Sequence, residues 1–84
     1  MKHELDLLVE NHQGVLSRIA RLFDGRDYSL ESLISTRASE PDASRIRLVV
    51  SGAREAVEKA AKQLEKLVDV LEVRMWSLDQ ASNR

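Results

Sequence analysis

Alternation of apolar and polar residues marks the first segment of the chain. Between residues 3 and 10, Leu5, Leu7 and Val9 alternate with the acidic residues Glu4, Asp6 and Glu10. A period of two sends successive side chains to opposite faces of a β-strand, so the segment predicts a strand with one buried face. Leu8 breaks the alternation and puts an apolar side chain on the face that the acidic residues occupy.

Two later segments have the period of amphipathic helices. The first follows the turn at residues 11–14 and is ended by Gly25, and its apolar stripe consists of Val15, Leu16, Ile19, Leu22 and Phe23. The second runs from about residue 53 to residue 66, after a capping Ser51 or Gly52, and its buried stripe consists of Val57, Ala60, Ala61, Leu64 and Leu67. Both helices need an apolar surface to cover.

Three further segments have the composition of strands. Residues 28–38 contain strand formers, but their alternation fails over residues 31–34, which predicts a bulge. After a turn at residues 39–43, signalled by Pro41 and Asp42, residues 44–51 alternate, with Ile46, Leu48 and Val50 on one face and Arg45, Arg47 and Val49 on the other. The last strand is expected at residues 69–78, with Leu71, Val73 and Met75 inward and Glu72, Arg74 and Trp76 outward.

The order of these elements, βαββαβ, predicts an α+β fold, the ferredoxin-like sandwich, over residues 1–78. Right-handed crossovers place both helices on one face of a four-stranded antiparallel sheet, with the expected strand order 4-1-3-2. Residues 79–84 form a polar tail that we expect to be disordered. The other face of the sheet is left without helices.

By parity, the uncovered face should carry four large apolar side chains beside three arginines, namely Leu8, Leu33, Val49 and Trp76 beside Arg45, Arg47 and Arg74. Such a cluster is unusual on a solitary domain and indicates a docking surface for another protein. The alternative is a scatter of ordinary surface residues, or an error in the parity of one strand, because single exposed apolar side chains are common.

Composition narrows the ways in which so small a domain can be stabilised. The chain has 84 residues, enough for one domain with a small core. It has no cysteine, and its only histidines, His3 and His12, are too few and too scattered for a zinc site. Association with other chains is the remaining option, and we expect it.

Charge and hydropathy exclude two classes of partner. Thirteen basic and fourteen acidic residues give a formal net charge of −1, which argues against a nucleic-acid-binding protein. No apolar run approaches the length of a membrane span, and the charged N-terminus lacks the pattern of a signal peptide. Together these features predict a cytoplasmic protein with no membrane contact.

A convergent set of catalytic groups is not visible in the sequence. The candidate nucleophiles have no persuasive base partner, and these are Ser17, Ser29, Ser32, Ser35 and Thr36. His12 is interpreted as a solvated loop histidine. Phosphate-binding glycine motifs are absent, and the central strands lack the aromatic residues on which RNA bases stack. We therefore expect no catalytic residue in this chain.

The turn between the first strand and the first helix is the best candidate binding site. Gly14 permits close approach of a ligand to the backbone, and the N–H groups at the helix start suit a carboxylate. Asn11 adds an amide that both donates and accepts. Such a loop could hold the carboxylate of an amino acid while Val15, Leu16 and Leu30 accept its side chain. Glycine and asparagine also occur in such turns for geometry alone, and that reading stays open.

Residues 9–23, VENHQGVLSRIARLF, resemble the opening of the ACT domain in the small, regulatory subunit of acetolactate synthase (acetohydroxyacid synthase), which reads V-E-N-x-P-G-V-L-x-R-I-x-x-L-F. The resemblance continues at residues 28–33, YSLESL, at 49–52, VVSG, and at 62–70, KQLEKLVDV. It extends over about residues 2 to 78. Four motifs in the right order make it more specific than a general likeness to ACT domains.

The resemblance implies a homodimer in which second strands and first helices of two copies pair into one eight-stranded sheet. A branched-chain amino acid, typically valine, would lie between the copies, bound by Asn11, Gly14, Val15 and Leu16 of one chain and by Ser29 and Leu30 of the other. The implied partner is the catalytic large subunit, which holds thiamine diphosphate, FAD and magnesium, whereas this chain binds no cofactor. The implied role is non-catalytic: activating that subunit and conferring feedback inhibition in branched-chain amino-acid biosynthesis.

Three departures from the family pattern bear on this role. Gln13 replaces a proline at the helix start, which costs some preorganisation. Ser29 stands where the family usually has asparagine, and its shorter side chain favours an alternative function: a structural partner subunit that stabilises the catalytic chain and senses no effector. The sequence matches one ACT domain, whereas many members carry a second, C-terminal domain. Activation of a partner is therefore the safer inference than valine sensitivity.

Overall fold

Four strands and two helices succeed one another in the order β1 (Lys2–Glu10), α1 (Val15–Leu22), β2 (Tyr28–Arg37), β3 (Ala43–Gly52), α2 (Arg54–Glu65) and β4 (Val70–Ser77). The computed structural model describes residues 1–11, 13–23 and 27–78. His12, the expected helix end at Gly25 and the expected disordered tail at residues 79–84 lie outside these residues. The order confirms the βαββαβ prediction.

The strands form one antiparallel sheet in the order β2-β3-β1-β4, which confirms the predicted order 4-1-3-2. In the centre, Leu5 lies opposite Leu48 and Leu7 lies opposite Ile46. Side chains that are directly opposite share one face of a sheet, so these pairs make a continuous apolar surface on both central strands. The long strands β1 and β3 are thus held in a register that buries the odd-numbered face of β1.

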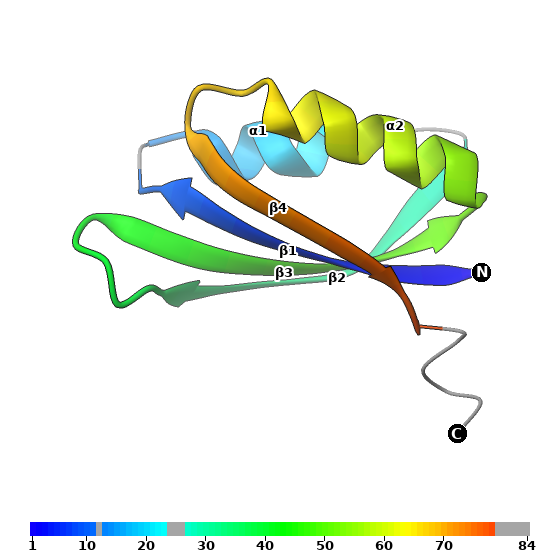
Figure 1. Ribbon diagram of the computed structural model, residues 1–84, viewed down its shortest axis with the longest axis horizontal. Coiled ribbons are helices and arrows are strands. Elements are labelled where there is room, and N and C mark those ends of the chain that lie inside the picture. Colours follow the sequence, from blue (N-terminus) through cyan, green and yellow to red (C-terminus); the bar gives the residue numbers. More distant parts are fainter. Residues whose placement is uncertain (12, 24–26, 79–84) are drawn as a thin grey trace.

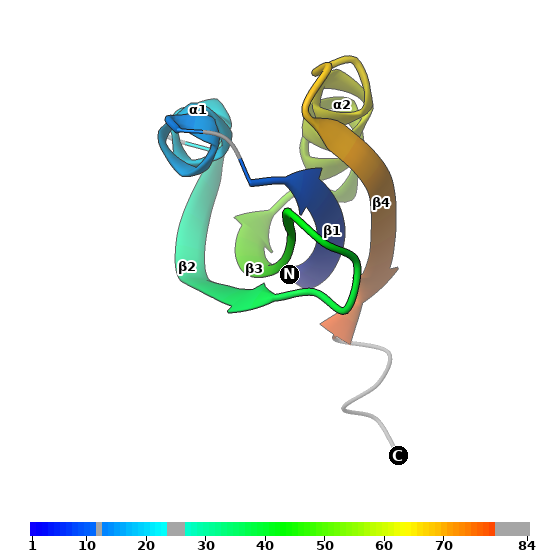
Figure 2. The same cartoon turned by 90° about the vertical axis from the view of Figure 1, so that its left-hand side faces the viewer.

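Both helices cover this apolar face and leave the other face of the sheet without helices (Figures 1 and 2). Figure 2 shows α1 on the side of β2 and β3 and α2 on the side of β1 and β4. Each helix belongs to a crossover between strands of the same sheet, and right-handed crossovers bring both to the same side.

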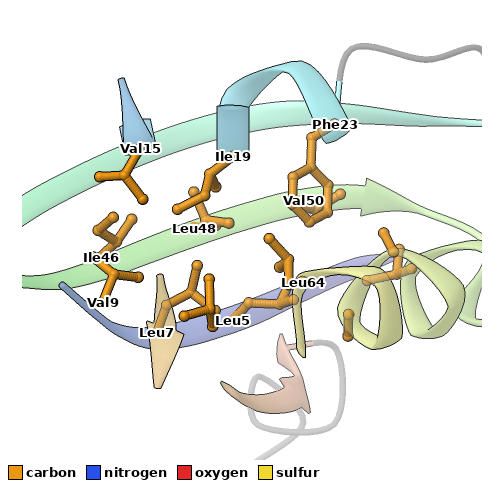
Figure 3. Close-up of a cluster of buried hydrophobic side chains, with 14 residues drawn as sticks. Leu5, Leu7, Val9, Val15, Ile19, Phe23, Ile46, Leu48, Val50 and Leu64 are labelled. Carbon is orange, nitrogen blue, oxygen red and sulfur yellow. The ribbon is translucent and has the colours of Figure 1, made fainter. Parts of the chain in front are cut away.

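The core lies between the helices and the central strands (Figure 3). From α1 and its end come Val15, Ile19 and Phe23, and from α2 come Val57, Ala60, Ala61 and Leu64. The strands contribute Leu5, Leu7, Val9, Ile46, Leu48, Val50 and Val70. The predicted stripe of α2 is confirmed except for Leu67, which lies beyond the helix end and is half-buried against the core. Leu16 of the predicted α1 stripe is exposed. Leu16 is one residue from Val15, about 100° around the helix, so it points away from the sheet.

The helix termini differ in part from the prediction. Helix α2 is preceded by Ala53 in an extended conformation with no side-chain cap. Ser51 and Gly52, the expected caps, are instead the last residues of β3. The end of α1 is closed by Tyr28, whose hydroxyl donates to the carbonyl of Leu22 at 2.7 Å and whose ring lies 5.5 Å from that of Phe23.

A bulge in β2 moves one residue of the predicted open face to the core side. The register with β3 shifts between Leu30 and Ser32, which confirms the bulge expected near residues 31–34. After the shift Leu33 lies opposite Leu48 and packs against the core, so its predicted place on the open face was wrong. Ile34, which is 55% exposed and lies opposite Arg47, takes that place. A single extra residue reverses the parity of everything after it.

A second irregularity, in β4, corrects the prediction for Leu71. The pairing shifts from Val9 with Val70 to Leu8 with Glu72, so Leu71 is an extra residue and is 54% exposed. Val70, one position earlier, fills the buried site. The inward placement of Val73 and Met75 is confirmed, because both pack against the core.

Gly52 is required at its position by the close approach of the start of β2. A Cβ on Gly52 would lie 2.8 Å from both the carbonyl oxygen of Asp27 and the Cβ of Tyr28. Backbone would have to move to relieve this overlap, so Gly52→Ala is expected to lower the free energy of unfolding by about 1–3 kcal/mol. Urea denaturation measures the loss. The control Ser51→Ala should change it by less than about 0.5 kcal/mol, and equal midpoints for the two variants would contradict the steric account.

His3 is a polar side chain in an apolar site. It is 1% exposed, and neither ring nitrogen has a hydrogen-bond partner among the residues that the structure describes. Because a buried polar atom without a partner costs about 1–3 kcal/mol, His3→Leu is expected to raise the free energy of unfolding by about 1 kcal/mol. The control His3→Gln keeps polar atoms in the same place and should give no gain. Loss of stability in the leucine variant, measured by urea denaturation, would mean that the histidine is satisfied in solution.

Candidate functional site

The loop between β1 and α1 is fastened at its start by two backbone hydrogen bonds. The N–H of Glu10 donates to the carbonyl of Asp69 at 2.8 Å, in the segment between α2 and β4. The N–H of Asn11 donates to the carbonyl of Asp42 at 2.8 Å, in the hairpin between β2 and β3. Asp42 is in the left-handed region, with φ 58°. The loop is therefore held between two other connections, the α2–β4 segment and the β2–β3 hairpin, which lie at the same end of the sheet.

At its far end the loop passes directly into α1. Gly14 has φ 85° and ψ −3°, a left-handed conformation that glycine adopts without strain. Its carbonyl accepts the first helical hydrogen bond, from the N–H of Arg18 at 3.1 Å. The N–H groups of the first turn have no partner within the helix, and no acidic side chain lies in that turn. The helix start can therefore receive an anion.

Four of the predicted site residues line one cavity beside this loop. The cavity has a volume of about 80 Å³ and is lined by Asn11, Gly14, Val15 and Leu16 together with Val9, Ser35, Ser44 and Ile46. A Cβ on Gly14 would meet no atom within 4 Å, so the glycine borders open space. Pockets for small-molecule ligands usually measure about 300–1,000 Å³, so the cavity within one chain is too small to enclose an amino acid alone.

The other two predicted site residues lie elsewhere. Ser29 and Leu30, at the start of β2, line a shallow hollow of about 640 Å³ with Ser17, Ala20, Arg21, Phe23 and Tyr28. Within one chain the loop residues and this pair therefore do not share a cavity.

Ser35 and Ser44 are site residues that the sequence reasoning missed. Ser35 lies opposite Ile46 because the bulge has already reversed the parity of β2, so its hydroxyl belongs to the helix-covered side. Ser44, at the start of β3, lies opposite Val9. The mixed strand pattern near residues 31–34 was the available signal, but it does not say which residue is extra. The two serines add hydroxyl groups to a cavity that is otherwise mainly apolar.

Strand β2 is an edge strand with an exposed outer side. It is ten residues long and lies at one end of the sheet. Most of its side chains are exposed, and the exposed Leu16 of α1 lies in the helix on the same side of the molecule (Figure 2). A long edge strand offers backbone N–H and C=O groups to another strand.

The open face of the sheet carries alternating charges with apolar residues at its margins. Asp6 lies opposite Arg47 on one side and Arg74 on the other. The Nε of Arg47 is 3.1 Å from a carboxylate oxygen of Glu4. It is also 3.4 Å from a carboxylate oxygen of Asp6, but this ion pair lacks the geometry of a hydrogen bond. The apolar members, here called the open-face cluster, are Leu8, Ile34, Val49 and Trp76.

Two kinds of feature are not found among residues 1–11, 13–23 and 27–78. No group of three histidine, aspartate or glutamate side chains is placed to hold a metal ion. Within the same residues no helix is long and apolar enough to cross a membrane.

Comparison with known proteins shows what the chain resembles. Residues 5–72 match the family model described as the AHAS small subunit-like ACT domain. The chain is 44% identical over 73 residues to a probable acetolactate synthase small subunit of Archaeoglobus fulgidus, covering 87% of this chain and 46% of that protein. It is 42% identical over 73 residues to the acetolactate synthase isozyme 3 small subunit of Escherichia coli, covering 87% of this chain and 45% of that protein.

Solved structures give the same picture of the fold. The acetolactate synthase small subunit of Thermotoga maritima superimposes with a TM-score of 0.78 at 32% identity, over 89% of this chain and 47% of that one. The ACT domain of GTP pyrophosphokinase from Chlorobium tepidum superimposes with a TM-score of 0.75 at 12% identity, a likeness of fold alone. The chain spans about half the length of the acetolactate synthase small subunits it matches.

Proposed function

The chain belongs to the family of AHAS small subunit-like ACT domains, and we propose that it is a regulatory partner of the catalytic large subunit of acetolactate synthase. The observation that carries the proposal is the family match over residues 5–72, together with relatives that are named small subunits of this enzyme. In this role the chain binds the large subunit, raises its activity and makes it responsive to a branched-chain amino acid.

The effector site of this proposal is completed by a second copy of the chain. Two β2 strands pair at their free edges around a two-fold axis, which joins two sheets into one of eight strands. The loop cavity of one copy, with Asn11, Gly14 and Leu16, then meets Ser29 and Leu30 of the other. The small size of the cavity within one chain and the exposed edge of β2 support this arrangement.

The chemistry of the two halves suits an apolar amino acid. The effector carboxylate lies at the N–H groups at the start of α1, where no acidic side chain competes for them. The amide of Asn11 is a partner for the effector ammonium. Val15, Leu16 and Leu30 surround the aliphatic side chain, and valine is the effector that we expect.

Regulation follows from linkage between effector and partner. An effector that binds one conformation of the assembly more tightly than another shifts the equilibrium by that difference in affinity. The catalytic subunit then becomes less or more active according to the conformation that the effector favours. Because coupling is reciprocal, the large subunit changes the affinity for the effector by the same factor.

We place the contact with the large subunit on the open face of the sheet, through the open-face cluster. Leu8, Ile34, Val49 and Trp76 lie on a face that neither helix covers (Figure 2). Tryptophan is among the residues that contribute most to binding energy in interfaces. The arginines and carboxylates that lie between these apolar residues, such as Arg47 and Asp6, add charge complementarity that sets orientation.

Ser29 supports a second candidate function. It occupies the place that is usually asparagine in the family pattern, and its hydroxyl reaches less far than an amide. In this second function the chain docks on the large subunit and stabilises it without sensing an effector.

Titration of valine into the purified chain separates the two functions. We expect binding heat at millimolar valine, and we expect Ser29→Asn to tighten binding by about threefold to tenfold, the worth of one added hydrogen bond. The matched control Ser39→Asn, in the exposed hairpin, should leave the affinity unchanged. If neither the wild-type chain nor Ser29→Asn gives binding heat even when the valine concentration is raised a further tenfold, only the structural role remains.

Docking is tested by co-purification with the large subunit encoded in the same genome. Trp76→Ala and Ile34→Ala are each expected to weaken binding at least tenfold, since truncating a large apolar side chain that is buried in an interface costs about 2 kcal/mol or more. The control Val68→Ala removes an equally apolar and more exposed side chain away from this face. Undiminished binding by the first two variants, or equal loss in the control, would place the contact elsewhere.

A further inference from the structure

Asp69 contacts the chain on both sides of the loop between β1 and α1. Its backbone carbonyl accepts a hydrogen bond from the N–H of Glu10, the last residue of β1, at 2.8 Å. Its carboxylate forms a hydrogen-bonded ion pair with the guanidinium of Arg18, one turn into α1. One residue of the segment between α2 and β4 therefore fixes the end of the strand and the start of the helix together.

This ion pair is placed where it can hold a fixed geometry. The side chain of Asp69 is 7% exposed and that of Arg18 is 48% exposed. The carboxylate is thus shielded from water, which strengthens its attraction for the guanidinium, while the arginine retains part of its hydration. Asp69 itself is held in place, because the N–H of Val70 donates to the carbonyl of Leu67 at 3.1 Å and Val70 lies opposite Val9.

The C-terminal end of helix α1 is held by the hydrogen bond from Tyr28, whereas the start of the helix has few other contacts that set its orientation. The helix is eight residues long, and its buried side chains are Val15 and Ile19. Apolar packing is non-directional, so two such side chains permit small rotations of the helix. A charge-assisted hydrogen bond is directional, and the guanidinium of Arg18 matches a carboxylate in one orientation. The Asp69 pair therefore decides where the N–H groups at the helix start point.

We propose that Arg18 and Asp69 are positioning residues of the effector loop, which they hold in the geometry that receives a carboxylate. The inference rests on the proposed function, because it assigns the pair a role in that same site. Asn11 holds the side of the loop that faces the hairpin through Asp42, and the ion pair holds the side that faces α2. Neither Arg18 nor Asp69 lines the loop cavity, so both act through the backbone that they orient.

Calorimetric titration of valine into five variants of the full chain tests this role, at a temperature where each is folded. Arg18→Gln and Asp69→Asn are each expected to weaken valine affinity about tenfold, and the double variant no more than about twofold further, because the residues act as one unit. Arg18→Lys, which keeps the charge, should recover part of the loss. The fifth variant, the control Ala60→Gly, destabilises α2 away from the loop and should leave the affinity unchanged.

Hydrogen exchange of the same chains provides a readout that needs no effector. In Asp69→Asn we expect the hydrogen-bonded amides of residues 18–22 in α1 to exchange about tenfold faster, with those of β3 unchanged, because only local opening is affected. Should wild type bind no valine, the sensing function fails and exchange alone decides the positioning role. The positioning role would be overturned if valine affinity were unchanged in both single variants, if their losses were additive in the double variant, or if Ala60→Gly lost as much. Hydrogen exchange that rises uniformly along the chain, or does not rise at all, would overturn it as well.

Discussion

The outer edge of β2 has ten residues of backbone with no neighbouring strand in the part of the chain that the structure describes. Such an edge is a template for another strand, and proteins either protect it or use it. Here it has neither a proline nor a covering helix, and the exposed Leu16 of α1 lies on the same side. In the proposed assembly, pairing of two copies at this edge would also bring together the two groups of candidate site residues that line separate cavities within one chain. The proposed assembly and the proposed binding site therefore depend on the same unpaired strand.

The one-sided sheet explains why a small domain would need such an assembly. Its core is a single layer of side chains between two helices and one face of the sheet. Domains of this size bury only about 60% or slightly more of the surface of the unfolded chain, so few kcal/mol remain as net stability. Helix α1 is the shorter helix and is fixed in part by an ion pair. The helix that borders the proposed site is thus the one of the two helices with fewer buried side chains.

The element order, the strand order and the main core were predictable because they depend on patterns that the local sequence carries. The alternation around Leu5, Leu7 and Val9 requires a strand with one buried face, and the period of Val57, Ala60 and Leu64 requires a helix. With two right-handed crossovers, few topologies remain. The resemblance of residues 9–23 then identified the family that the comparison shows.

The errors in the strands arose at the two register shifts, which a pattern of period two cannot locate. In β2 the extra residue exchanges Leu33 for Ile34 on the open face, and in β4 it exchanges Leu71 for Val70 in the core. Sequence reasoning anticipated the first shift but not its consequences, and so it missed the cavity residue Ser35. Partners of Asp69 were beyond reach as well, because a contact 51 residues apart depends on how three turns meet.

The most direct test of the edge-paired assembly is a nuclear Overhauser experiment on a mixture of isotope-labelled and unlabelled chains, filtered to detect only contacts between chains. The account predicts intermolecular contacts between the methyl groups of Leu16 and those of Leu30, with α1 of one copy near the start of β2 of the other. A monomer with no intermolecular contacts at millimolar concentration, or contacts confined to the edge of β4, would contradict it.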